Sequence, residues 1–78
     1  MRDILNLIWD AILKLDEDRD GVADDVLRLI SFLYEAYRLC FNLYTREYGL
    51  NDYPEDVPNL AQVKATVRNI RYRYELKT

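Results

Sequence analysis

The chain has 78 residues, a formal charge of −3 and 50% apolar residues, with seven tyrosines and only two glycines. A chain of this size forms one domain with a small hydrophobic core, and its composition excludes a disordered segment or a repeat array. The sequence contains no histidine and a single cysteine, Cys40, which excludes catalytic triads, zinc sites and internal disulfides. We therefore expect a single helical domain over residues 1–78 that is not an enzyme.

Composition also bears on where the protein works. No stretch reaches the roughly 18 uncharged apolar residues that a membrane span requires. The opening MRDILNLIWD places Asp3 and Asp10 among its apolar residues, unlike a signal peptide. A lone cysteine is typical of a reducing compartment. We expect a cytoplasmic protein that does not contact a membrane.

The first apolar segment, residues 4–15, predicts an amphipathic helix. Its main apolar residues recur at helical spacing, at Ile4, Leu5, Ile8, Trp9, Ile12 and Leu15. Polar residues form only a narrow stripe, so the segment is apolar around most of its circumference. Trp9 and Leu13 lie away from the main apolar face, which makes Trp9 a candidate interface residue.

The stretch that follows, residues 16–25, holds six carboxylates and one guanidinium. Residues 16–21 spell D-x-D-x-D-G, which resembles the calcium loop of EF-hand proteins and of their dockerin-like bacterial relatives. The resemblance implies Ca²⁺ ligands at Asp16, Asp18, Asp20, Val22 and Asp24. Leu27 stands at the twelfth place, where an EF-hand has a bidentate glutamate. The implied site is therefore incomplete, and its affinity for calcium is expected to be weak.

The same stretch also fits a solvated turn between two helices. Carboxylates at the end of a helix face the negative end of its dipole, which costs roughly some tenths of a kcal/mol each. A bound Ca²⁺, Arg19 or the basic residues near the C-terminus would each offset this cost. In the second interpretation Gly21 reverses the chain and Asp24 caps the next helix. The residues alone leave both interpretations open.

The second apolar segment, residues 25–48, predicts one long helix that begins at Asp24 or Asp25 and ends before Gly49. Residues three or four positions apart form rows along such a helix, and three of its four rows are apolar. One of these rows is aromatic and comprises Ile30, Tyr34, Tyr37, Phe41, Tyr44 and Tyr48. Two partner helices of the expected lengths cannot cover three sides of such a helix, so we expect the aromatic row to stay exposed.

An exposed aromatic row predicts an interface, because tyrosine combines a large apolar ring with a hydroxyl that stays hydrogen-bonded at a partly wet contact. The candidate interface residues are Trp9, Tyr34, Tyr37, Phe41, Tyr44 and Tyr48. We expect a homodimer, most simply two-fold with the long helices in contact, or a protein that binds or inhibits another protein. The alternative is that these rings are ordinary core, covered by Leu50, Tyr53 and Val57 of the connector.

The third segment, residues 59–76, fits two secondary structures. Apolar residues recur at helical spacing over residues 60–74, and Asn59 with Gln62 resembles a capping box. Residues 70–77 also alternate apolar and charged side chains, which is typical of a half-buried strand. We predict an all-α fold, a helix-loop-helix plus a third helix, with the long helix in the centre. A short C-terminal strand is the alternative.

The C-terminal part is basic, with cations at Lys64, Arg68, Arg71 and Arg73. Residues 71–74 interleave arginine with tyrosine, a pattern that stacks single-stranded bases and neutralises phosphates. Binding of single-stranded nucleic acid is therefore an alternative function, although an acidic protein predicts poor affinity for it. The other interpretation is that this basic tail attracts the acidic stretch of its own chain.

Overall fold

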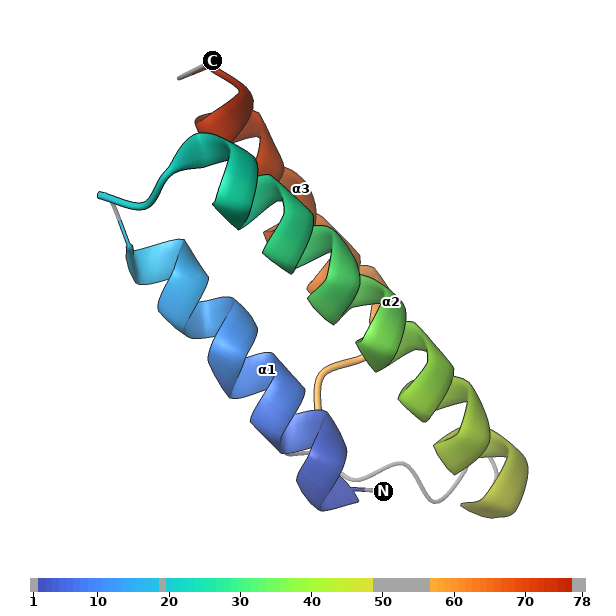
Figure 1. Cartoon of the computed structure of the whole chain (residues 1–78). Coiled ribbons are helices and arrows are strands. Elements are labelled where there is room, and N and C mark those ends of the chain that lie inside the picture. Colours follow the sequence, from blue (N-terminus) through green and yellow to red (C-terminus); the bar gives the residue numbers. More distant parts are fainter. Residues whose placement is uncertain (1, 19, 49–56, 77–78) are drawn as a thin grey trace.

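Three helices follow one another in the described part of the computed structural model, which comprises residues 2–18, 20–48 and 57–76 (Figure 1). They are α1 (Arg2–Glu17), α2 (Ala23–Tyr48) and α3 (Leu60–Glu75). Successive helices run in opposite directions, so α1 and α3 point the same way, and α3 lies behind α2 in this view. The bundle measures 41 × 18 × 18 Å. The predicted all-α, three-helix fold with a long central helix is confirmed.

Local signals place the helix starts close to where the sequence predicts them. Asp24 and Asp25 lie in the first turn of α2, where carboxylates meet the positive end of the helix dipole. Asn59 is the N-cap of α3, and its Oδ1 accepts a hydrogen bond from the backbone N–H of Gln62 at 2.9 Å. The predicted cap at Asn59 is therefore confirmed.

The C-terminal segment is helical through Glu75, with Leu76 as the C-cap. The alternation over residues 70–75 therefore does not make a strand, while Lys77 lies outside the described residues. Ile70 and Tyr74 are four positions apart and both are buried, on the same face of α3 as Val63 and Val67. Helical spacing buries all four side chains at once, whereas a lone strand would have no intramolecular partner.

The core is built from apolar residues of all three helices and from Val57, which precedes α3. Its buried members are Leu5, Ile12, Val26, Ile30, Tyr37, Phe41, Tyr44, Val57, Val63, Val67, Ile70 and Tyr74. Five of these come from α2, which packs against α1 on one side and α3 on the other. Burial of these residues is the main favourable contribution to the stability of the bundle.

The prediction that the aromatic row of α2 is exposed is wrong. Tyr37 is fully buried, and Phe41 and Tyr44 are nearly so. The Tyr37 hydroxyl donates a hydrogen bond to the Pro58 carbonyl at 2.6 Å, which removes the cost of burying it. The rings of Tyr37 and Phe41 stack with centroids 6.3 Å apart. The bundle thus buries the row with the largest apolar area.

The other candidate interface residues have mixed positions. Tyr34 and Trp9 are half-buried and pack against the edge of the core. The side chain of Tyr48 lies outside the described residues, as do Leu50 and Tyr53, but Val57 is buried in the core as the alternative interpretation expected. The aromatic row therefore follows the core interpretation rather than the interface one.

Candidate functional site

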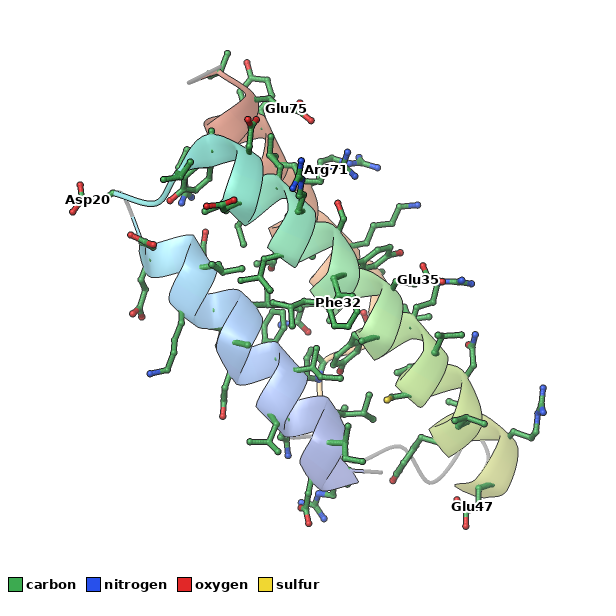
Figure 2. All side chains as sticks on the ribbon, viewed as in Figure 1. Asp20, Phe32, Glu35, Glu47, Arg71 and Glu75 are labelled. Atoms are coloured by element: carbon green, nitrogen blue, oxygen red, sulfur yellow. The ribbon has the colours of Figure 1, made fainter. Side chains whose placement is uncertain are left out.

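A different apolar row of α2 remains exposed. Its large members are Leu29, Phe32, Leu39 and Leu43, spaced at three, four and seven residues. Phe32 is 70% exposed and the other three are 46–53% exposed. Figure 2 shows Phe32 on the side of α2 that faces α1, toward the viewer, and Glu35 on the opposite side of the helix. The sequence predicted that the aromatic row would stay uncovered, whereas the structure leaves these four side chains uncovered instead.

Helix α1 continues this apolar surface. Ile4 is 46% exposed and Leu7, one turn further along, is 68% exposed. By helical spacing Ile4, Ile8 and Leu15 lie on one flank of α1. Helix α1 runs antiparallel to α2 (Figure 1). Ile8 and Leu15 are half-buried and pack against the core below. The exposed residues of this surface, which we name the outer face, are Ile4, Leu7, Leu29, Phe32, Leu39 and Leu43.

The outer face is large for a protein of this size. Six side chains that are about half exposed or more present on the order of 600 Å² of apolar area, if each contributes roughly 200 Å² when fully exposed. The largest apolar patch on a typical monomer is about 300–600 Å² and is often functional.

Charged side chains of both signs surround the outer face. The exposed ones on α1 and α2 include Asp3, Asp10, Lys14, Asp25, Arg28, Arg46 and Glu47. On the far side of α2, Arg38 Nε donates to Glu35 Oε2 at 3.3 Å, and a second guanidinium nitrogen also binds this carboxylate. This hydrogen bond, together with the charge of Arg38, holds the pKa of the Glu35 carboxyl below its ordinary value.

The acidic turn between α1 and α2 is joined to the C-terminal part of α3. Arg73 Nη1 donates to the Asp16 carbonyl at 2.7 Å, and Arg73 Nη2 donates to Asp16 Oδ1 at 3.0 Å. The Tyr74 hydroxyl donates to the Asp18 carbonyl at 2.8 Å. These contacts supply donors to carbonyls at the end of α1 and place a cation at the negative end of its dipole. The attraction between basic tail and acidic stretch acts through Arg73.

The other carboxylates of the turn do not converge. Asp18 Oδ1 accepts a hydrogen bond from the backbone N–H of Asp20 at 3.0 Å, and the Asp20 side chain points outward (Figure 2). The Val22 carbonyl accepts the backbone N–H of Val26 at the start of α2, and Asp24 is exposed. Among the residues that the structure describes, no three histidine, cysteine, aspartate or glutamate side chains lie close enough to hold a metal. Binding of Ca²⁺ stays a prediction, which thermal melting with calcium and with chelator would test.

Gly21 is required by close packing. A Cβ at this position would lie 2.7 Å from Val26 Cγ2 and 3.3 Å from the Tyr74 hydroxyl oxygen. Both distances are below ordinary contact, and the first is a clash. The D-x-D-x-D-G pattern thus has a structural explanation at its glycine, which lets Val26 and Tyr74 approach the turn.

The remaining basic residues share one exposed face of α3, because Lys64, Arg68 and Arg71 are spaced at four and three residues. Arg71 also forms an ion pair with Glu75 at 3.9 Å on the surface. Tyr72 is 66% exposed whereas Tyr74 is buried in the core. The interleaved pattern of residues 71–74 therefore divides between surface and core, and Tyr74 cannot stack on a base while the bundle is folded.

Sequence reasoning missed two features of these sites. The row that contains Phe32 and Leu39 was visible in the spacing of α2, but the aromatic row appeared the more exposed one. Opposite charges predicted an attraction between the basic tail and the acidic stretch. The specific pair of Arg73 and Asp16 was not predicted, because these residues are 57 positions apart and have no local signal.

Comparisons with known proteins found no matching family model, no matching curated protein and no matching solved structure. No helix in the described ranges is long and apolar enough to cross a membrane.

Proposed function

We propose that the protein is a non-catalytic contact module that associates with another protein chain through the outer face. The observation that carries this proposal is the exposure of six large apolar side chains on α1 and α2. Each of these helices already buries another row in the core, so the outer face is surplus to the fold. Exposed apolar area of this size in a small protein marks an interaction surface.

The form of the outer face fits a protein partner. It is carried by two packed helices, so a partner meets a surface that is already ordered and the entropy cost of binding is small. An apolar centre with charged side chains around it is the ordinary anatomy of a protein interface. Phe32 is the largest and most exposed side chain of the set, and we expect it to be the dominant contact.

Photo-cross-linking in the cells that make the protein tests this proposal. A benzophenone amino acid replaces Phe32 in one variant and Tyr72 in a control variant, since the two rings are similarly exposed, at 70% and 66%, on different faces. We expect a discrete covalent adduct from position 32 and none of that mass from position 72. If position 32 yields no adduct beyond the control, the outer face is not a contact surface and the proposal fails.

A further inference from the structure

We infer that the chain that covers the outer face is a second copy of this protein, related to the first by a two-fold axis. This inference rests on the proposed function, because it names the partner for the same surface. Three features of the structure favour a second copy: the area of the outer face, the direction of its helices and the signs of the surrounding charges.

The apolar area agrees with what a stable dimer needs. A standard interface buries about 800 Å² on each partner, and about 65% of a homodimer interface is apolar, which corresponds to roughly 520 Å². The outer face presents on the order of 600 Å². One copy therefore supplies the apolar part of a standard interface, and its charged surroundings supply the remainder.

The helix directions also suit self-association. Helices α1 and α2 form an antiparallel pair, and α3 lies behind α2 (Figure 1). Phe32 of the outer face points toward the viewer, away from α3 (Figure 2). A two-fold axis in the plane of the outer face packs α1 and α2 of one copy against α1 and α2 of the other copy. Each of the four helices then has antiparallel neighbours, as in a four-helix bundle. The α3 helices stay on the two outer sides of the dimer.

The charges around the outer face do not oppose this arrangement. The acidic residues Asp3, Asp10, Asp25 and Glu47 are interspersed with Lys14, Arg28 and Arg46, all of them exposed. A surface of one sign would repel its own copy and would fit a partner of opposite charge. A surface of mixed sign does not repel its copy, and opposite charges at its edges can pair across the two-fold axis.

Analytical ultracentrifugation across a series of protein concentrations tests the inference. We expect the mass to rise from 9.4 kDa to twice that value as the concentration increases. The variant Phe32→Ala should weaken the dimer on the order of a hundredfold, because two rings per dimer lose their apolar contact. Leu7→Ala should weaken it about tenfold, since α1 also contributes to the interface.

Tyr72→Ala is the matched control, because its ring is similarly exposed but lies on α3. We expect it to change the dissociation constant by no more than about threefold. Circular dichroism verifies that each variant keeps its helices. If Phe32→Ala were to unfold the protein, the dissociation constant of Leu7→Ala would be compared with that of the control instead.

A constant monomer mass, a mass above the dimer, or equal effects of Phe32→Ala and Tyr72→Ala would each overturn the inference. The proposed function fails separately. If the purified protein stays monomeric while position 32 still forms its adduct in cells, the second copy is rejected and the contact function stands. If the protein stays monomeric and position 32 yields no adduct, both are rejected.

Discussion

Removal of one buried hydroxyl tests whether the long helix and the start of α3 are joined as the structure indicates. Tyr37 is fully buried in the centre of α2, and its hydroxyl donates to the Pro58 carbonyl at 2.6 Å. Pro58 is itself buried, so water does not readily replace the lost donor. The variant Tyr37→Phe keeps the ring and its apolar contacts and removes this hydrogen bond.

The expected cost follows from the unsatisfied carbonyl. A buried acceptor that loses its donor destabilises the folded state by about 1–2 kcal/mol. In a domain of this size each kcal/mol lowers the melting temperature by roughly 4–8 °C, so we expect a decrease on the order of 10 °C. Thermal melting followed by circular dichroism measures it. All samples need the same protein concentration, because self-association would raise the melting temperature.

Tyr72→Phe is the control for this experiment. Tyr72 is 66% exposed, so water replaces any hydrogen bond of its hydroxyl, and the change should stay within about 0.5 kcal/mol. Equal melting temperatures for Tyr37→Phe and the unmodified protein would refute the reasoning. In that case the contact between Tyr37 and Pro58 does not contribute to the stability of the bundle.

Three further predictions follow from the turn and from the surface of α2. Gly21→Ala should destabilise the fold by about 1–3 kcal/mol in chemical denaturation, because its Cβ would lie 2.7 Å from a methyl group of the core; an unchanged midpoint would contradict this packing. Arg73→Gln should lower the free energy of unfolding by about 1 kcal/mol, since the ion pair with Asp16 is partly exposed. The difference in stability between this variant and the unmodified protein should become smaller at high salt. A salt-independent difference would show that charge is not its cause. In an NMR titration the pKa of Glu35 should lie below the ordinary value and should rise in Arg38→Gln. Because the folded-state pKa is lowered, the pair stabilises the fold above the unfolded-state pKa, and this contribution disappears as the pH falls through the folded-state value. A Glu35 pKa that is the same in both proteins would mean that the pair does not form in solution.

The contact between Arg73 and the acidic turn also joins α3 to the C-terminal end of α1. Six carboxylates lie within residues 16–25, and α1 ends among them. The guanidinium of Arg73 and the hydroxyl of Tyr74 bind carbonyls at this end from a different helix. The third helix therefore serves as the C-terminal cap of the first, which helps to explain how a helix can end in an acidic stretch.

The helices themselves were determined by the sequence alone. Apolar spacing predicted the first two helices and favoured a helix over a strand for the third, and the Asn59 cap marked the start of α3. These features depend on residues within one or two helical turns of each other, so they can be predicted from the amino-acid sequence. The excess of apolar rows on α2 led to the prediction of an exposed aromatic row, which was wrong.

The tertiary structure alone decided which rows meet. On α2 the aromatic row containing Tyr37 and the row containing Phe32 are both apolar, and spacing cannot rank them. The choice depends on how α1 and α3 pack together and on the hydroxyl of Tyr37 finding the Pro58 carbonyl. The same holds for Arg73, whose partner Asp16 is 57 residues away. Contacts between distant residues depend on the whole packed arrangement, so they appear only when the three helices are brought together.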